Sequence, residues 1–543
     1  MEKISVTLDL PVYKEYDVAV VGGGCSGSIA ALGAARNGAK TILLERSGVL
    51  GGNMSQGLVQ SIHGYRSDNN INGKKVPAAD WSNALVVPKS SITMELYNRI
   101  HDSGGTAFPG HHNAPSLREN VDEEVVIYTL DKMMKESNVD VLFNTYVFDV
   151  IMNGDTVTGI VIANKSGPQI IKSGIVIDCS ADADIATRAG VDYLYGEEEF
   201  GYRAHGISLK MELGGIDVNR YLEYLYNRPE LTAEEQKVYD QDVKDLLNGG
   251  EDVPLTIRSF DGTEKGAFTQ AGERAHRKVT IEDQLKALAN NEFLMTRNML
   301  KREWVQYIKD HPEIPYMPNT LTLKPIYPTF PHLAQFGLVR NGRIRYDQTM
   351  LGVSECFVDS TNEEELSKGI LLCREINWIQ VNFLRERIPG FEDSYIIKTA
   401  TYGGRESRQI VGEYMVLLDD LREGRIFEDN IAFCWRANNR HLLNGQIGTR
   451  IWYEPPKPFS FPYRCLIPRG VDGLLVAGRT VSKEVLVRVS SMVPCMQLGE
   501  AAGIAAGIAT VDKVSIREVD VNKVQKALHL DEVAIELGID IDK

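Results

Sequence analysis

The chain has 543 residues, of which 43% are hydrophobic and 24% are charged, and its formal net charge is −15. A chain of this length is too long for one hydrophobic core, so two or more domains are expected. The acidic balance argues against sequence-independent binding to nucleic acid or to an anionic membrane, because both need a basic surface. We therefore expect no nucleic-acid partner and no membrane partner.

The N-terminal segment and the lack of a long apolar run predict a cytoplasmic location. Residues 1–16 contain no apolar core of signal-peptide length. No other stretch reaches the ~20 apolar residues that cross a bilayer, even the alanine-rich run near the C-terminus. None of the seven cysteines forms a C-x-x-C pair, so zinc-ribbon, iron–sulfur and thioredoxin-like motifs are absent and no metal site is expected. Scattered thiols of this kind are typical of buried, reduced side chains.

The segment from 17 to 37 has the order of a nucleotide-binding unit. The run DVAVV predicts a buried parallel strand over 17–21, and SIAALGAARN predicts a helix over 28–37. Between them lies a G-x-G-x-x-G turn, whose glycines are Gly22, Gly24 and Gly27. The first glycine permits a tight turn, the second lets the backbone approach a pyrophosphate, and the third lets the helix close on the strand. The start of the helix then presents N–H groups to the phosphates.

The residues that follow favour one dinucleotide over another. A second predicted strand, KTILL over 40–44, ends at Glu45, where a carboxylate can accept hydrogen bonds from both hydroxyls of a ribose. A second glycine pair, Gly51 and Gly52, follows in SGVLGGNMSQG. Nicotinamide-only dehydrogenases need no such loop at this position. The order of strand, turn, helix, strand and acid predicts dinucleotide binding. The glycine pair resembles that of FAD enzymes of the glutathione-reductase type, in which this position lies over the pyrophosphate, and this resemblance implies FAD.

Four stretches resemble a known family: KEYDVAVVGGG through LLERSGVLGGN, GIVIDCSADADIATRAG, TYGGRESRQIVGEY and DGLLVAGRTVSKEVLVRVSSMVPCMQLGEAAGIAAGIA. They resemble the FAD-dependent oxidoreductase family, which is distantly related to the flavoprotein subunits of succinate dehydrogenase and fumarate reductase. The resemblance implies an α/β fold: a Rossmann-like FAD-binding domain of the glutathione-reductase type with an inserted α+β substrate or cap domain. It also implies FAD as the cofactor, and we expect it to be held noncovalently.

Composition divides the chain into four parts. We expect the first part of the FAD-binding domain over 1–200, the inserted domain over 201–395, the second part of the FAD-binding domain over 396–512, and a C-terminal helical tail over 513–543. Short apolar runs separated by turn signals over 140–178 predict a β-meander beside the first nucleotide-binding unit.

The resemblance implies cofactor contacts from several parts of the chain. They are Gly22, Gly24, Cys25, Ser26, Gly27, Glu45, Arg46, Gly51, Gly52, Asn53, Met54, Val147, Ser180, Ala181, Asp182, Gly478, Arg479, Gln497, Leu498 and Gly499. At Arg479 many FAD proteins place an acid that binds ribitol. The arginine here places a positive charge near the pyrophosphate, or else it points outward as a surface residue.

Glycines recur every four residues in the last of these stretches, at Gly499, Gly503 and Gly507. This spacing predicts a groove of small side chains along one side of a helix, packed closely on a neighbour. A second role is implied by the resemblance: the N-terminus of this helix, around Gln497, would face the N1/O2 edge of the isoalloxazine. Its dipole would then stabilise the reduced flavin.

Candidate substrate residues come from three other segments. Arg405 and Arg408 would share a face on a helix and clamp a carboxylate, or they would form an internal ion-pair network between the cap and the FAD domain. Arg488 lies in a segment that approaches the flavin in the family. His205 and His441 are possible proton carriers, or structural histidines. Cys25 is interpreted as a small side chain tolerated in the phosphate turn, with redox chemistry as the alternative. His63 could attach FAD covalently by analogy with succinate dehydrogenase, but its surroundings do not match the attachment motif of that enzyme. His111 and His112 are assigned to a solvated loop.

We expect an FAD-dependent oxidoreductase that transfers a hydride between flavin N5 and a small organic substrate bound between the FAD and cap domains. An electron-acceptor protein or oxygen would reoxidise the flavin, and a homo-oligomer is possible. Two alternatives stay open: a flavin monooxygenase, which would need a route for NAD(P)H, and a non-catalytic electron-transfer subunit of a larger complex.

Overall fold

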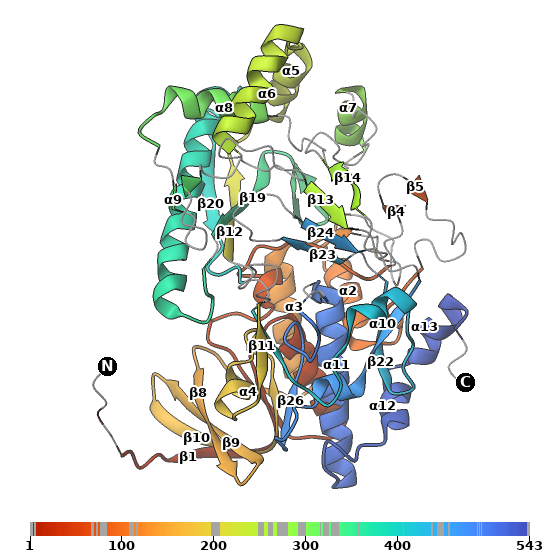
Figure 1. Cartoon of the computed structure of the whole chain (residues 1–543). Coiled ribbons are helices and arrows are strands. Elements are labelled where there is room, and N and C mark those ends of the chain that lie inside the picture. Colours follow the sequence, from red (N-terminus) through yellow and green to blue (C-terminus); the bar gives the residue numbers. More distant parts are fainter. Residues whose placement is uncertain are drawn as a thin grey trace.

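The structure is a computed structural model with two lobes, and both ends of the described chain lie on the lower one (Figure 1). It describes residues 4, 7–66, 70–71, 74–75, 84–107, 113, 115, 118–196, 207–247, 255–258, 264–268, 281–290, 300–314, 317–318, 325–326, 336–356, 358–404, 407–435, 438–441, 450–453, 457–485, 487, 489 and 491–539.

The lower lobe is built on one sheet with the strand order β7-β2-β1-β10-β9-β8, and β26 also pairs with β10. These strands are β1 (Val12–Val21), β2 (Thr41–Leu44), β7 (Asp140–Leu142), β8 (Tyr146–Asn153), β9 (Thr156–Asn164), β10 (Gly167–Asp178) and β26 (Leu474–Val476). β1 runs parallel to β2 and β10, and β10 runs parallel to β26. β8, β9 and β10 form the predicted antiparallel meander. The Rossmann-like parallel sheet is confirmed, and it joins both ends of the chain.

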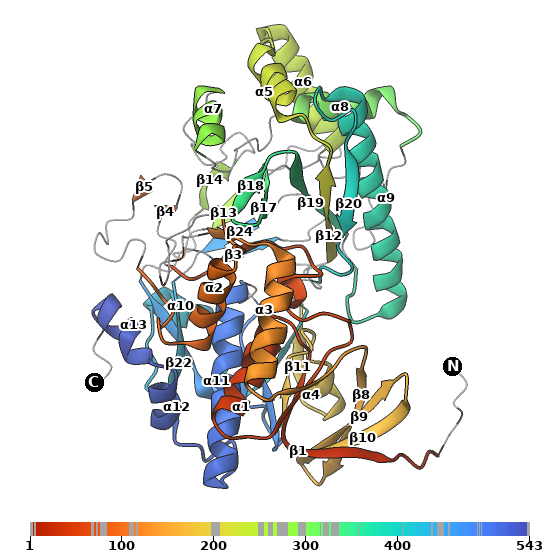
Figure 2. The same ribbon diagram turned by 180° about the vertical axis from the view of Figure 1, so that it is seen from behind.

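Two helices cover this sheet and lie against each other (Figure 2). They are α1 (Cys25–Arg36) and α11 (Met492–Asp512). A Cβ added at Gly503 would meet the carbonyl oxygen of Ala30, and one added at Gly507 would lie 2.9 Å from the carbonyl oxygen of Ala34. The groove of small residues along α11 is therefore confirmed, and its packing partner is the backbone of α1.

Helix α11 is long and apolar enough, by length and composition, to cross a membrane. The expectation that no segment has this length is therefore wrong for α11. Buried positions make up 89% of its most apolar 18-residue window. This burial is what the core helix of a folded domain shows.

The close approach of α1 and α11 predicts that a side chain at Gly503 would destabilise the protein. We expect Gly503→Ala to lower the free energy of unfolding by about 1–3 kcal/mol, because the new methyl group meets backbone atoms that cannot move alone. Urea unfolding of the apoprotein would measure this. Gly48→Ala is the control: a Cβ there meets nothing within 4 Å, and we expect a change within about 0.5 kcal/mol. Equal stability of the two variants would contradict the packing described here.

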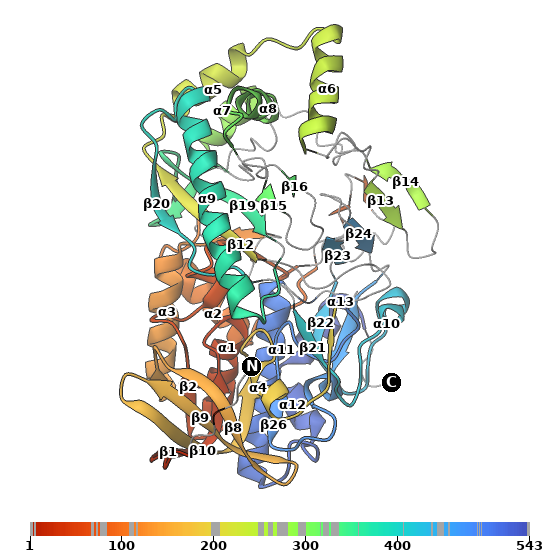
Figure 3. The same ribbon diagram turned by 60° about the vertical axis from the view of Figure 1, so that its left-hand side comes forward.

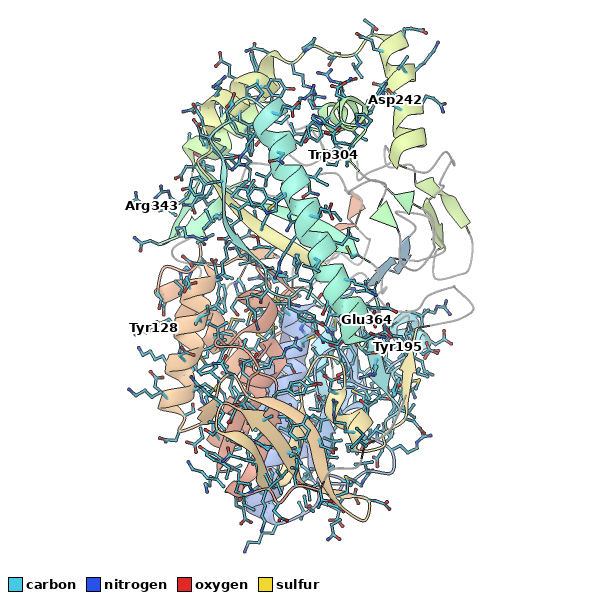
Figure 4. All side chains as sticks on the ribbon, turned by 90° about the vertical axis from the view of Figure 1, so that its left-hand side faces the viewer. Tyr128, Tyr195, Asp242, Trp304, Arg343 and Glu364 are labelled. Atoms are coloured by element: carbon cyan, nitrogen blue, oxygen red, sulfur yellow. The ribbon has the colours of Figure 1, made fainter. Side chains whose placement is uncertain are left out.

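The upper lobe is an α+β unit around the three-stranded sheet β19-β12-β20 (Figure 3). Its elements are β12 (Ile207–Gly214), α5 (Val218–Asn227), α6 (Ala233–Leu247), α7 (Ile281–Ala289), α8 (Lys301–Asp310), β17 (Leu338–Arg340), β18 (Arg343–Arg345), β19 (Gln348–Cys356), α9 (Glu363–Arg387) and β20 (Tyr395–Thr399). Trp304 is fully buried in its core, with its ring 5.1 Å from that of Phe383 on α9 (Figure 4). Because β20 belongs to this sheet, the upper lobe extends a few residues past 395; the division into four parts stays a prediction.

The remaining elements connect and flank the two sheets. They are η1 (Gly52–Met54), β3 (Ser61–His63), β4 (Asn70–Ile71), β5 (Lys74–Lys75), α2 (Ile92–Asp102), β6 (Arg118–Asn120), α3 (Glu123–Glu136), α4 (Asp184–Arg188), β11 (Tyr193–Tyr195), β13 (Leu255–Arg258), β14 (Glu264–Phe268), β15 (Met317–Pro318), β16 (Pro325–Ile326), β21 (Arg408–Ile410), α10 (Leu418–Glu423), β22 (Asn430–Cys434), β23 (Asn438–His441), β24 (Arg450–Tyr453), β25 (Phe459–Pro462), η5 (Tyr463–Leu466), α12 (Val521–Ala527) and α13 (Leu530–Leu537).

A buried polar cluster joins the two lobes. The guanidinium of Arg340 on β17 donates to Glu123 of α3 at 3.0 Å and to Glu212 of β12 at 2.9 Å. Gln60 donates to the same two carboxylates. Burial and the nearby charge of Glu123 raise the pKa of Glu212, while Arg340 lowers it. Because the carboxylates are buried and hydrogen-bonded, this cluster fixes the upper lobe on α3.

Candidate functional site

Two glycines of the first turn are required by the protein's own packing. Gly22 has φ +99°, a left-handed conformation that L side chains rarely adopt. A Cβ at Gly27 would collide with the carbonyl oxygen of Gly22 and would lie 3.0 Å from the side chain of Cys179. These contacts press the start of α1 against the ends of β1 and β10. The tight turn and the close approach of helix and strand are as predicted.

Gly24 differs, because no contact among the described residues requires a glycine there. It is the N-cap of α1, and its φ of −72° suits any residue. A Cβ on Gly24 would meet only the Cα of Gly52, at 4.0 Å. The space in front of Gly24 opens into a cleft toward which the start of α1 presents its N–H groups. A bound phosphate group would fit this space and would explain the glycine.

The second glycine pair lies directly against the first turn. Gly51 has φ +96° and Gly52 has φ +53°. The Gly51 N–H donates to the carbonyl of Gly23 at 2.9 Å, and the Cys25 thiol donates to the carbonyl of Gly51 at 3.4 Å. Gly52 therefore lines the cleft while Gly51 packs behind it, and Cys25 contributes a small side chain to the turn.

Glu45 is held in place by backbone amides at the end of β2. The Gly23 N–H donates to its Oε2 and the Ser47 N–H donates to its Oε1, both at 2.7 Å. Each carboxylate oxygen has a second lone pair. The side chain is 4% exposed and lines the cleft. It can therefore accept further hydrogen bonds from a hydroxylated ligand without moving.

The cleft brings together segments from both ends of the chain. Thirteen of the predicted cofactor residues line it: Gly22, Gly24, Cys25, Ser26, Glu45, Arg46, Gly52, Asn53, Val147, Ser180, Ala181, Gly478 and Arg479. Gly27, Gly51, Met54, Asp182, Gln497, Leu498 and Gly499 are not part of its wall. Gly27 and Gly51 pack against residues of the wall without lining the cleft themselves. The residues that line the cleft extend from the end of β2 to the start of α11, and a ligand of this extent would fit between them.

Arg479 is buried, so the surface alternative for this residue is wrong. Its side chain is 9% exposed. Its Nε donates to the carbonyl of Ala181 at 2.6 Å, Nη1 donates to the carbonyl of Gly404 at 2.7 Å, and Nη2 donates to Asp182 at 3.0 Å. Burial lowers the pKa of Arg479, but the charge of Asp182 more than offsets this effect. Much of its positive charge is therefore balanced inside the protein.

Asp182 lies behind the cleft wall and collects three donors. They are Arg479, the hydroxyl of Ser407 and the hydroxyl of Tyr402, the last at 3.3 Å. The preceding residue, Ala181, has φ +77°, which costs a residue with a side chain roughly 1–2 kcal/mol. The hydrogen bond from Arg479 to the Ala181 carbonyl holds the turn in this conformation. Asp182 therefore positions the wall and does not form it.

Arg46 is the second cation at the cleft, and no carboxylate pairs with it directly among the described contacts. Its guanidinium lies over the ring of Tyr402, 4.8 Å from the ring centroid. Burial lowers the pKa of Arg46, but the nearby Tyr402 and carboxylates raise it overall. An arginine so placed can donate to an anionic or aromatic ligand in the cleft.

The sequence-based interpretation missed twelve residues of the wall. They are Val21, Leu44, Gln56, Thr145, Tyr146, Cys179, Asp184, Ile185, Tyr402, Ala477, Met492 and Cys495. Several directly adjoin predicted residues at strand ends, as Val21, Leu44 and Cys179 do. Carboxyl ends of parallel strands meet at one edge of a sheet, and this rule could have identified them. Tyr402 has no such local signal.

The start of α11 lies elsewhere than predicted. The helix begins at Met492 with Ser491 as its N-cap, five residues before Gln497. Gln497, Leu498 and Gly499 are therefore inside the helix and buried, and Gly499 packs on the backbone of Ser26. Met492 and Cys495 of the first turn line the cleft instead. The N-terminal end of α11 thus does face the cleft, but through other residues.

Arg408 lies on a strand, so the predicted helical face shared with Arg405 is wrong. On β21, its Nη1 donates to Asp184 at 3.2 Å and to the carbonyl of Asp182 at 3.1 Å. It is not part of the cleft wall. The ion-pair alternative is the correct one for Arg408, although the pair joins two parts of the lower lobe and not the cap.

The other predicted substrate residues lie mostly outside the described part of the chain. Arg405, Arg488, His205, His111 and His112 lie outside the described residues. His441 is the last residue of β23, and its side chain is likewise outside the description. His63, on β3, has its Nε2 3.0 Å from the hydroxyl of Ser61 and is not in the cleft wall.

A Rossmann-like sheet, a glycine turn at a helix start and a strand-end carboxylate together define a dinucleotide-binding protein. A scan of family models matches residues 17–528 to the FAD dependent oxidoreductase family. The chain belongs to this family, and FAD is its cofactor.

Three solved structures illustrate the range of similar proteins. One is a geranylgeranyl bacteriochlorophyll reductase-like protein from Thermoplasma acidophilum, with 12% identity, TM-score 0.38, and coverage of 96% of this chain and 83% of that one. A triple mutant of a flavin-dependent brominase has 12% identity, TM-score 0.36, and coverage of 96% and 85%. THI4 from Thermovibrio ammonificans has 22% identity, TM-score 0.24, and coverage of 34% and 66%. Similarity at this level says nothing of the reaction.

Proposed function

We propose that the protein transfers a hydride between N5 of FAD and a small organic substrate bound between the two lobes. The observation that carries this proposal is the cleft itself, whose wall comes from both ends of the chain and leaves space in front of Gly24. FAD, when bound, supplies the two-electron redox chemistry. The residues of the cleft wall would bind it and orient it.

The wall supports a definite orientation of the cofactor. Gly24 and the start of α1 would hold the pyrophosphate, and Glu45 would accept hydrogen bonds from the ribose hydroxyls. The first turn of α11, with Met492 and Cys495, would lie on the side of the ring. The positive end of this helix favours negative charge there by about 0.3–2 kcal/mol. The segment from β20 to Gly404 joins the cleft to the upper lobe, since the Thr401 N–H donates to the carbonyl of Gln56, which lines the cleft, at 3.1 Å.

Anaerobic bleaching tests this proposal. The oxidised holoenzyme is mixed with hydroxy acids, sugars, amines and saturated acids, and the chemically reduced holoenzyme is mixed with carbonyl compounds and enoates. We expect one class to bleach or restore the visible flavin band within seconds, with stoichiometric formation of the oxidised or reduced organic product. Consumption of NADPH and oxygen with formation of a hydroxylated product would instead contradict direct hydride transfer to the substrate.

Asp184 gives the cleft a predicted pH dependence. Burial and the charges of Asp182 and Asp178 raise its pKa from 3.8 to about 6, while Arg408 lowers it. A raised pKa means that the stability contributed by this group is fully present below about pH 4 and is lost as the pH rises through 6. Ionisation also places a negative charge in the wall of a site for an anionic pyrophosphate.

We therefore expect the affinity of the apoprotein for FAD to fall by roughly fivefold as the pH rises through 6. Repulsion between the ionised Asp184 carboxylate and the pyrophosphate should cost about 1 kcal/mol at a site that solvent partly screens. Asp184→Asn keeps an oxygen for Arg408 and should remove this step. Titration of FAD fluorescence between about pH 5 and 8 would measure both proteins. An identical step in the variant would show that another group is responsible.

A further inference from the structure

Two thiols of the upper lobe lie in direct contact. The Cys373 Sγ is 3.2 Å from the Cys356 Sγ. Cys356 is the last residue of β19, and Cys373 lies in α9. A disulfide needs a sulfur–sulfur distance of about 2.05 Å, so the two atoms have to approach by only ~1.2 Å. Side-chain rotation can supply a movement of this size.

We propose that Cys356 and Cys373 are a redox modification site that forms a reversible intramolecular disulfide when the protein meets a hydroperoxide. The structure orders the two steps by exposure, because Cys356 is 5% exposed and Cys373 is fully buried. Hydrogen peroxide oxidises the Cys356 thiol to a sulfenic acid and is itself reduced to water. The Cys373 thiol then attacks the Cys356 sulfur, the S–S bond forms and a second water leaves. Two thiols and one peroxide thus give one disulfide and two waters.

The surroundings favour a disulfide over further oxidation of either sulfur. Both thiols belong to an apolar cluster that includes Leu58, Ile207 and Leu209. A sulfinic or sulfonic acid would place a charge in this cluster without a hydrated environment, which is costly. A disulfide adds no charge and no polar hydrogen. The contact between the two sulfurs also gives Cys373 the advantage over a thiol from solution.

Backbone contacts connect this site with the flavin cleft. Cys356 pairs with Ile207 across β19 and β12, and Ile207 in turn forms a bridge with Gly404. The carbonyl of Gly404 accepts a hydrogen bond from Arg479, which lines the cleft. A disulfide between β19 and α9 would therefore restrict the motion of β19 and of β12, which pairs with it. The segment at Gly404 is bridged to β12 and would be restricted as well. We expect the disulfide to slow the dissociation of FAD by about two- to fivefold.

Peptide mapping tests the modification directly. The holoenzyme is treated with hydrogen peroxide, blocked with iodoacetamide under denaturing conditions and digested with trypsin. We expect peptides 346–368 and 369–374 to appear joined, with the mass of two hydrogens missing, and to separate after dithiothreitol. Cys434→Ala should behave as the wild type. Cys356→Ala and Cys373→Ala should each lose the joined species while retaining bound flavin.

Two results would overturn the proposal. The first is alkylation of both cysteines in the treated wild-type protein, or oxidation of either one to a sulfinic acid without the joined peptide. The second concerns the link to the cleft: an FAD dissociation rate that is the same in the oxidised and the reduced wild-type protein would exclude it. All three variants, Cys434→Ala, Cys356→Ala and Cys373→Ala, receive the same peroxide treatment. A general effect of peroxide on flavin retention would therefore appear in all three.

Discussion

Gly24→Ala is expected to lower the affinity for FAD by roughly 100-fold, or about 2.7 kcal/mol, while leaving the fold intact. The added methyl group meets only the Cα of Gly52, at 4.0 Å, so the apoprotein has space for it. It occupies the space in which the pyrophosphate has to approach the start of α1. Fluorescence titration of the apoprotein with FAD would measure the loss, and urea unfolding should show a change below about 1 kcal/mol.

Gly27→Ala is the matched control, because it adds the same methyl group three residues further on. Its Cβ would collide with the carbonyl of Gly22, so we expect the apoprotein to lose about 1–3 kcal/mol of stability. The two variants should therefore separate a cofactor effect from a packing effect. If Gly24→Ala binds FAD as the wild type does, the pyrophosphate lies somewhere else.

Arg479→Met is expected to destabilise the apoprotein by about 3–5 kcal/mol, because it leaves the buried carboxylate of Asp182 without its cation. The carbonyls of Ala181 and Gly404 would lose their donors as well. Both effects act on the turn that forms the cleft wall, so bound flavin should be lost together with stability. Chemical unfolding followed by circular dichroism would measure the first effect, and absorbance of the purified protein the second.

Arg345→Met provides the comparison with an exposed ion pair. Arg345 lies 3.0 Å from Asp347, with side chains 54% and 48% exposed. Removal of such a pair should cost less than about 1 kcal/mol and should leave the flavin content unchanged. Similar losses in the two arginine variants would mean that the Arg479–Asp182 pair has no special role in the wall.

The nucleotide-binding unit could be predicted because its signals are local. The strand DVAVV, the three glycines and the acid at Glu45 fix the turn geometry within thirty residues, and β1, α1 and β2 follow in this order. The glycine spacing in α11 was equally informative, since a four-residue repeat defines a helical face. In both cases the backbone itself requires the residue type.

The start of α11 was misplaced although a local signal was present. Ser491 is a common N-cap residue, and Pro494 fits the first turn of a helix because the N–H that it lacks has no partner there. These two residues mark the helix start that the structure shows at Met492. The family resemblance, which implies a helix start around Gln497, places it five residues too late.

The partners of the arginines could not be predicted, because they come from distant segments. Arg408 is on a strand since β21 pairs with β11, more than two hundred residues earlier in the chain. Arg479 is buried because Asp182 and the carbonyls of Ala181 and Gly404 surround it. The charge pattern alone left surface and buried positions equally open, and only the tertiary fold decides between them.

The central claim is that two distant parts of this chain, the glycine turns near the N-terminus and the segment from Gly478 to the start of α11, hold a single FAD. Flavin content of the purified protein, measured by absorbance before and after denaturation, tests it most directly. We predict one FAD for each chain, absorbing in the visible range and released into solution by denaturation. A colourless protein that gains no flavin band when FAD is added, or one that binds NAD in its place, would contradict the account.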